Sequence, residues 1–165
     1  NDTINDAVRI RLRSDVEIGA FLSGGLDSSA IAAVTDDLIE SGELDRTDVN
    51  AFTASFPNFV DDETDIAREF VATCKHIKLH EVQVDAKNVI AGLKQLAYDF
   101  DHPLFSFNTV VHNLIMKECK KRGVKVVING QGSDEAFAGY DRCMHCCRFV
   151  FFFSIFYTLW LSQFF

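Results

Sequence analysis

Residues 23–29 (SGGLDSS) combine residue types that together can hold a phosphate group. The two adjacent glycines allow the backbone to approach a ligand closely, and the serines add hydroxyl donors. A helix expected directly after the segment contributes unpaired N–H groups and the positive end of its dipole. Asp27 does not suit an anion site unless a divalent cation lies between, and Mg²⁺ on substrate phosphates takes one or two protein carboxylates. The segment therefore predicts a site for a phosphate compound and its magnesium ion.

The composition of this segment excludes two common nucleotide loops. It contains no lysine, so it is not the GxxxxGK[ST] loop, and its glycines do not follow the GxGxxG dinucleotide pattern. The simpler alternative is a strand-to-helix turn, in which the glycines serve the backbone geometry and an aspartate or serine caps the helix.

A second glycine-rich segment, residues 129–140 (NGQGSDEAFAGY), follows the apolar run VKVVI at 124–128. By itself it is also compatible with a plain turn, capped by Ser133 or Asp134 before a short helix.

Hydrophobic periodicity predicts the elements that position these two segments. Short apolar runs predict strands at residues 16–22, 49–56, 77–84 and 124–128, the last of them typical of a strand buried on both faces. Apolar residues at helical spacing predict helices at 1–14, 27–42, 63–75, 88–100 and 109–122. This alternation predicts an α/β fold, a parallel open sheet with helices on both faces. Ligands of such sheets bind beyond the carboxyl ends of the strands, which places the loops after Leu22 and Ile128 at the expected site.

Composition excludes several classes of protein. The 165 residues fit one domain, and 16 Lys and Arg against 24 Asp and Glu, without a basic run, disfavour nucleic-acid binding. Five cysteines, three of them bunched at 143–147, do not form the framework of a disulfide-rich secreted domain, and no secretory signal is visible. The uncharged, Phe-rich run 149–165 lies at the lower limit of length for crossing a bilayer and lacks a supporting basic flank, so we expect no membrane anchor.

The two glycine-rich segments together resemble the PP-loop ATP pyrophosphatases, an adenine-nucleotide alpha-hydrolase-like fold. Among these they are most similar to the synthetase domain of glutamine-hydrolysing asparagine synthetase, whose second loop is typically SGEG[AS]DE followed by GY. The segments VNAFTASF, DDETDIAREFVA, KLHEVQV and DHP also resemble that family. The resemblance covers residues 1–142. We expect this stretch to be a truncated synthetase domain and residues 143–165 to be an atypical Cys- and Phe-rich tail, an artefact of a truncated or mistranslated end.

The resemblance implies ATP and Mg²⁺ as cofactors and assigns roles to matching positions. The residues expected to hold the ATP phosphates are Ser23, Gly24, Gly25, Asp27 and Ser28. Those expected around the adenosine are Leu22 and Ala54, through their backbones, with Asn129 and Gly130. Asp27 and Asp134 would bind Mg²⁺ from opposite loops. In the implied cytoplasmic reaction, the β-carboxylate of aspartate attacks the α-phosphorus of ATP, and ammonia from glutamine displaces AMP from β-aspartyl-AMP.

Three departures from the family pattern leave alternatives open. Gln131 stands where the family has a catalytic-loop glutamate, and an amide cannot act as a base. We favour a variant that still positions the intermediate, but a related ligase with another nucleophile (a β-lactam synthetase or lasso-peptide cyclase type) or a non-catalytic nucleotide-binding remnant also fits. The family's glutaminase domain, with its N-terminal nucleophilic cysteine, is missing, because no cysteine stands at the start of this chain. After GY the family continues with a helical region that supplies a lysine, and here the Phe-rich tail stands in its place. We therefore expect an incomplete piece of a larger protein.

Three further clusters have simpler interpretations than a site. Residues 143–147 (CMHCC) lack the second ligand pair of a structural zinc site. His76 and His80 fall on one face of a strand, where exposed polar positions explain them better than a ligand pair. Asp61, Asp62 and Glu63 precede a helix, whose dipole they are expected to compensate; a substrate role for Asp62 or Glu63 rests on the family resemblance alone.

Overall fold

The computed structural model describes residues 2–57, 59–60, 62–104 and 106–134. The chain divides into two units, residues 1–130 and 131–165, and the elements named here all lie in the first. In chain order they are α1 (Asp2–Arg11), β1 (Ile18–Phe21), α2 (Leu26–Glu40), β2 (Val49–Ser55), α3 (Thr64–Val71), β3 (Ile77–Gln83), α4 (Ala86–Phe100), α5 (Asn108–Lys121) and β4 (Val126–Ile128). The predicted boundary at residue 142 lies outside the described residues.

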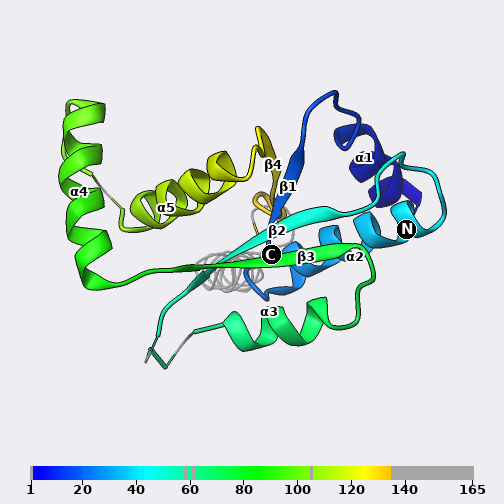
Figure 1. The fold of residues 1–165 in the computed structure, drawn as a ribbon, viewed down its shortest axis with the longest axis horizontal. Coiled ribbons are helices and arrows are strands. Elements are labelled where there is room, and N and C mark those ends of the chain that lie inside the picture. Colours follow the sequence, from blue (N-terminus) through cyan, green and yellow to red (C-terminus); the bar gives the residue numbers. More distant parts are fainter. Residues whose placement is uncertain (1, 58, 61, 105, 135–165) are drawn as a thin grey trace, which may run out of the picture. The chain divides into compact units, whose positions relative to one another are not determined.

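The strands form one parallel sheet in the order β3-β2-β1-β4 (Figure 1). Gly19 of β1 pairs with Asn50 of β2, and Ala20 of β1 pairs with Ile128 of β4. From β1 the chain first winds outward through β2 to β3, and then returns to place β4 on the other side of β1. The order of the strands therefore reverses between β1 and β4, which is the position where open α/β sheets bind ligands.

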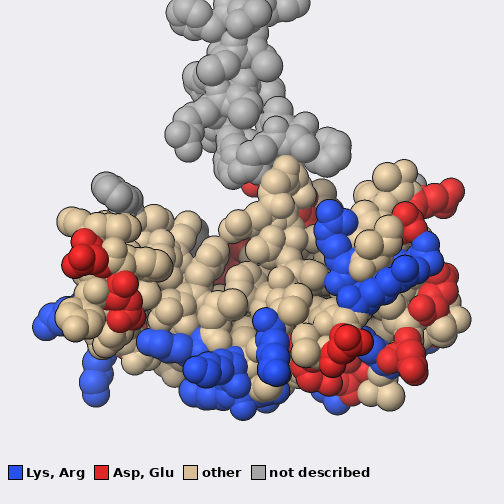
Figure 2. Space-filling model, turned by 90° about the horizontal axis from the view of Figure 1, so that it is seen from above, with Lys and Arg blue, Asp and Glu red and all other residues tan. Residues whose placement is uncertain are grey.

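Helices cover both faces of the sheet, which confirms the predicted α/β class. One core combines residues of α1, α2 and α3 with β1, and its largest fully buried members include Leu12, Ile18 and Leu22. The other core lies under α5, where Ile115 and Cys119 pack with Phe52 of β2. On the surface, Figure 2 shows acidic and basic side chains in small interspersed groups. No helix among the described residues is long and apolar enough to cross a bilayer.

The helix predicted to reach residue 75 ends at Val71. Its last turn does not continue because the carboxylate of Asp36, from α2, accepts the next available backbone amides. The two oxygens of Asp36 each lie 3.1 Å from the Lys75 nitrogen, and Oδ1 lies 2.6 Å from the His76 nitrogen. Asp36 is buried, so this contact fixes the point at which the chain leaves α3 and enters β3.

Two apolar runs are less buried than their patterns predict. The continuous run 124–128 suggests a strand covered on both faces, but within the described residues β4 is an edge strand, and Val126 is 41% exposed. In α4, Ile90 and Leu93 belong to the apolar stripe, yet they are 55% and 38% exposed. The reason is that α4 packs mainly against α5 (Figure 1), where Gly92 lies close to Val110 of α5, while Leu96 is the other buried residue of α4.

Candidate functional site

The segment after β1 is a compact turn built around the hydroxyl of Ser28. The backbone N–H of Ser23 donates to this oxygen at 3.1 Å, and the hydroxyl in turn donates to the carbonyl of Gly25 at 3.1 Å. The Ser23 hydroxyl lies 3.0 Å from the same oxygen. Ser28 is buried, and its hydroxyl makes these hydrogen bonds on the inner side of the turn. The backbone of the turn therefore faces outward.

The two glycines of this turn have different backbone requirements. Gly24 has φ +82°, a conformation that costs other residues strain, whereas Gly25 is extended, with φ −69° and ψ 160°. Gly25 occupies the N-cap position of α2 and brings no side chain that could accept from the first-turn N–H groups. The positive end of the α2 dipole is thus open to an anionic ligand. Asp27 lies in the same first turn and is half-buried.

The turn after β4 contacts the turn after β1. A Cβ atom added to Gly130 would lie 3.0 Å from the Cβ of Asp27 and 3.0 Å from the backbone nitrogen of Ser28. At these distances a side chain would have to push the backbone of the first turn away by a few tenths of an ångström, so glycine suits this close approach. Two predicted site segments, more than a hundred positions apart in the sequence, therefore meet at the carboxyl edge of β1 and β4.

The predicted adenosine contacts also lie at this edge. Leu22 is fully buried, and its N–H donates to the carbonyl of Phe52 at 2.9 Å, which extends the pairing of β1 with β2 by one residue. Ala54 is half-buried near the end of β2. Asn129 directly follows β4 and is exposed. Leu22, Ala54 and Asn129 thus border the two turns at the ends of three neighbouring strands.

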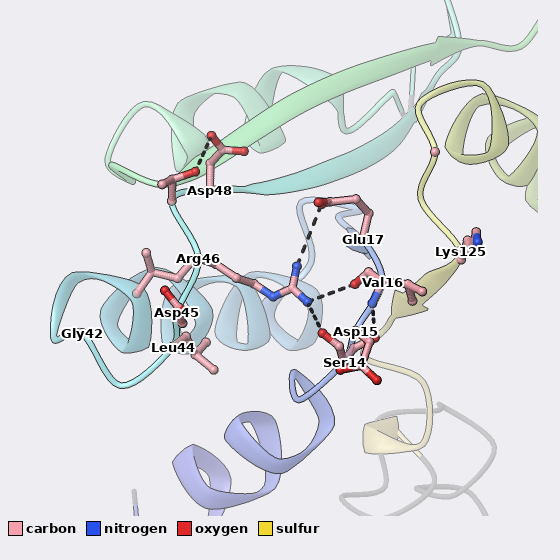
Figure 3. Close-up of a pocket in the computed structure, with 13 residues that line it drawn as sticks. Ser14, Asp15, Val16, Glu17, Gly42, Leu44, Asp45, Arg46, Asp48 and Lys125 are labelled. Carbon is pink, nitrogen blue, oxygen red and sulfur yellow. Dashed lines mark hydrogen bonds and ion pairs between the residues drawn. The ribbon is translucent and has the colours of Figure 1, made fainter.

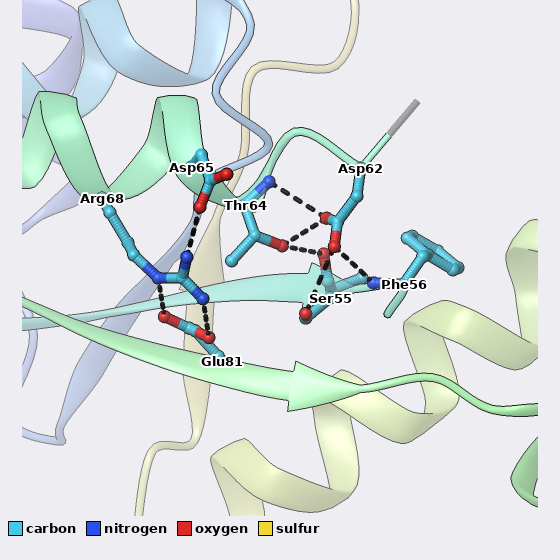
Figure 4. A network of polar contacts seen from close by, with 8 residues as sticks. Ser55, Phe56, Asp62, Thr64, Asp65, Arg68 and Glu81 are labelled. Carbon is cyan, nitrogen blue, oxygen red and sulfur yellow. Dashed lines mark hydrogen bonds and ion pairs between the residues drawn. The ribbon is translucent and has the colours of Figure 1, made fainter. Parts of the chain in front are cut away.

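Figure 4 shows a network of polar contacts at the start of α3. This part of α3 lies next to the turn after β1, because Gly24 of that turn is close to Glu63 and Ala67. Asp62 accepts from the backbone N–H of Thr64 at 3.0 Å and from that of Phe56 at 3.1 Å. Partial burial alone would raise the pKa of Asp62, but hydrogen bonds, led by the Thr64 side chain, outweigh it and hold the pKa below its ordinary value. Asp62 thus places its carboxylate on the first amide of α3, as dipole compensation by this cluster would require, although Glu63 is the N-cap residue and makes no side-chain cap. Sequence reasoning missed Ser55 and Thr64, because only the fold brings the end of β2 against this turn; the run Asp-Glu-Thr before a helix is the signal that points to Thr64.

The predicted metal pair and the substituted loop residue are divided between the two units. Asp27 belongs to the first unit, whereas Gln131 and Asp134 belong to the second. The shared magnesium ion and the role of Gln131 therefore stay predictions. Within residues 2–134, apart from the masked positions, no three His, Cys, Asp or Glu side chains converge as a metal site. Asp61 and the CMHCC cluster lie outside the described residues.

The two histidines near β3 each have a different partner, so they do not form a ligand pair. The ring Nδ1 of His76 lies 3.0 Å from the carbonyl of Thr47, and Nε2 of His80 lies 2.8 Å from Oδ1 of Asn50. The His80 ring also packs against Phe52 at a tilt of 37°, with 5.3 Å between ring centroids. Both histidines are half-buried rather than exposed, and burial is the main cause that lowers the pKa of His80.

A pocket of about 1080 Å³ lies at the opposite, amino edge of the sheet (Figure 3). Its walls are the loops that lead into β1, β2 and β4. Arg46 crosses it and donates to the carbonyls of Ser14 and Val16, at 3.0 Å each, with Glu17 at 3.9 Å. Because the guanidinium is used to tie two loops together, and because ligands of open α/β sheets bind at the carboxyl edge, we do not assign this pocket as the site.

Comparison with known proteins agrees with this geometry. The family model described as asparagine synthase matches residues 1–149. Asparagine synthetase [glutamine-hydrolyzing] 1 of Bacillus subtilis is 33% identical over 140 residues, which are 85% of this chain and 21% of that protein. The amidase chyE of Penicillium rubens is 33% identical over 144 residues, 82% of this chain and 21% of that protein. The chain thus spans about a fifth of the length of these relatives.

A solved structure supports the fold. The NH3-dependent NAD synthetase from Campylobacter jejuni superposes with a TM-score of 0.51 and 15% identity, covering 84% of this chain and 58% of that one. At this identity the likeness concerns the fold alone. The family match over most of the chain, together with the sequence identity to curated members, shows that this chain belongs to the asparagine synthase family.

Proposed function

We propose that this chain is the ATP-binding part of an ATP-dependent ligase that activates a carboxylate and forms an amide from it. The observation that supports this most directly is the contact between Gly130 and the turn Asp27–Ser28, at the point where the strand order reverses. Two glycine turns that meet beside an open helix N-terminus provide backbone N–H groups for a polyphosphate.

The residues of this edge fit a nucleotide. The phosphates would lie along Ser23, Gly24 and Gly25, two of which carry no side chain, and Ser28 would hold the turn in shape. The adenosine would lie against the backbones of Leu22 and Ala54 and against the Asn129–Gly130 turn.

Asp27, with Asp134 of the second unit, would hold Mg²⁺, which when bound offsets the charge of the pyrophosphate leaving group. The chain's own part is to position the α-phosphorus and to neutralise charge with oriented amides.

For the substrate we propose aspartate, in line with the names of the asparagine synthetase relatives. A β-carboxylate oxygen would attack the α-phosphorus of ATP, and the bond to the β-phosphate would break to release pyrophosphate. Ammonia would then attack the acyl carbon of β-aspartyl-AMP, so that AMP leaves and a proton is lost. Glutamine hydrolysis in another part of the longer protein would supply this ammonia. Within the chain, we propose residues 1–142 as the ligase domain and 143–165 as a tail outside it.

A second candidate is a related ligase with a different acceptor amine. Gln131 leaves this candidate open, because the loop departs here from the family glutamate and an amide cannot act as the base expected in asparagine synthesis. The relatives named as amidases, at the same identity as the asparagine synthetases, support it.

Mg²⁺-dependent exchange of labelled pyrophosphate into ATP tests both candidates. Exchange stimulated by aspartate supports the asparagine synthetase reaction, and exchange with a different carboxylate supports the related ligase. ATP binding without exchange for any carboxylate would refute the catalytic proposal for this chain and leave a nucleotide-binding remnant.

A further inference from the structure

The turn after β1 rests on the first turn of α3. A Cβ atom added to Gly24 would lie 3.1 Å from the carbonyl oxygen of Glu63, 3.3 Å from the Cβ of Ile66 and 3.4 Å from the nitrogen of Ala67. Two of these three neighbours are backbone atoms, which cannot yield by changing a rotamer. The position of Gly24 therefore depends on the position of the first turn of α3.

Asp62 fixes that turn through both oxygens of its carboxylate (Figure 4). Oδ1 accepts from the N–H of Thr64 at 3.0 Å and from the Thr64 hydroxyl. Oδ2 accepts from the N–H of Phe56 at 3.1 Å and from the Ser55 hydroxyl at 3.4 Å. One carboxylate thus ties the start of α3 to the end of β2. Thr64, which is buried, also reaches the carbonyl of Ala54 at 3.5 Å, next to the proposed adenosine site.

We propose that Asp62 is a positioning residue of the nucleotide site, which holds the first turn of α3 as a support for Gly24 and does not itself bind metal or substrate. This inference rests on the proposed function for its effect on ATP, but its effect on the turn is independent of that function. The two carboxylate oxygens of Asp62 accept from four donors of the protein, so its negative charge is already balanced by these hydrogen bonds. The same side chain acting as a magnesium ligand would instead have to leave at least one of these donors.

Asp65 provides a matched control for Asp62. It lies in the first turn of the same helix, but its side chain is 84% exposed and pairs only with Arg68 among the contacts described. We compare Asp62→Ala, Asp62→Asn and Asp65→Ala in the full chain, by hydrogen exchange of the amides of residues 23–29 and by the Kd of ATP at several Mg²⁺ concentrations.

We expect Asp62→Ala to speed amide exchange in residues 23–29 about tenfold and to weaken ATP binding about tenfold at every Mg²⁺ concentration. Asp62→Asn keeps one acceptor for the Thr64 amide and should recover part of both effects, whereas Asp65→Ala should change neither. Unchanged exchange in Asp62→Ala, or ATP affinity restored by additional Mg²⁺, would overturn the proposal; the second result would make Asp62 a metal ligand.

Two controls keep the outcome interpretable. If Asp62→Ala does not fold, Thr64→Val removes one donor to the carboxylate without changing the shape of the side chain, and Thr64→Ser restores it. Faster exchange in Thr64→Val but not in Thr64→Ser supports the proposal, and equal exchange contradicts it. If the unmodified chain does not bind ATP, the proposed function fails, while the exchange measurements still decide whether Asp62 positions the turn.

Discussion

Replacing Gly24 by alanine tests whether the turn after β1 has the described geometry. With φ +82°, Gly24 lies in a region that costs an L residue about 1–2 kcal/mol. The added methyl group would also lie 3.1 Å from the carbonyl oxygen of Glu63, so the turn and α3 must separate by a few tenths of an ångström. Together these contributions predict a loss of about 2 kcal/mol in the free energy of unfolding.

Gly25→Ala is the matched control, since it makes the same chemical change one residue later. At φ −69° and ψ 160°, Gly25 has a conformation that alanine adopts readily, and its added Cβ would meet only the Ser23 hydroxyl, at 3.3 Å. The reduced entropy of the unfolded chain offsets the weaker N-cap, so we expect a change within about 0.5 kcal/mol.

Urea unfolding followed by far-ultraviolet circular dichroism measures both variants. In a thermal melt of the same variants, a difference of about 2 kcal/mol corresponds to a midpoint about 6 °C lower for Gly24→Ala than for Gly25→Ala in a domain of this size. Equal midpoints for the two variants would show that Gly24 does not have a left-handed conformation packed on α3. Stability reduced equally in both would likewise refute the geometric reasoning, because only Gly24 is strained by a side chain.

Three further predictions concern aspartates at different places in the fold. Asp27→Asn should reduce Mg²⁺-dependent ATP/pyrophosphate exchange about 100-fold at an unchanged urea midpoint, and unchanged exchange would remove Asp27 from the metal site. Asp36→Ala should cost about 2–3 kcal/mol in urea unfolding, because it leaves the amides of Lys75 and His76 without their acceptor, whereas the exposed Asp37→Ala should cost less than about 0.5 kcal/mol. The pKa of Asp62 is lowered from 3.8 by folding, so its stabilisation is complete above pH 3.8 and is lost as the pH falls through the lower folded value. Acid titration of stability should therefore be shallower in Asp62→Asn than in the unmodified chain, and identical acid limbs would contradict this.

The sheet and the two turns could be predicted because their signals are local. Short apolar runs, helical spacing and the SGG sequence each act within a few residues, and the alternation of strand and helix then determines a parallel sheet. The requirement for glycine at Gly24 follows from a positive φ that no other residue type adopts as easily. The contact of Gly130 with Asp27 could be expected from the rule that carboxyl ends of parallel strands share an edge, although the distance could not.

Burial and long-range polar contacts could not be predicted in this way. The stripe that contains Ile90 and Leu93 predicts a helix, but periodicity does not state what covers the apolar face, and in the structure α4 packs mainly on α5. The end of α3 at Val71 depends on Asp36, about 35 positions earlier in the sequence. The bond between Asp62 and the Phe56 amide likewise depends on how the chain turns between β2 and α3. These contacts are made by aspartates, which the sequence alone would place on the surface as readily as in the interior. Only the folded structure shows which amides they reach.

Two helices begin at the same edge of this sheet, and their N-termini are treated differently. The start of α3 receives the carboxylate of Asp62, so the protein's own anion compensates its dipole. The start of α2 has Gly25 at the N-cap and no accepting side chain, although Ser23 and Ser28 lie close by and are used to shape the turn. A serine or aspartate at the N-cap would stabilise α2 by about 1 kcal/mol. The first amide of α3 thus has a protein carboxylate as its acceptor, whereas the N-cap of α2 is a glycine that offers none; an external anion would fill that place, and this is why we assign the phosphates to α2 and not to α3.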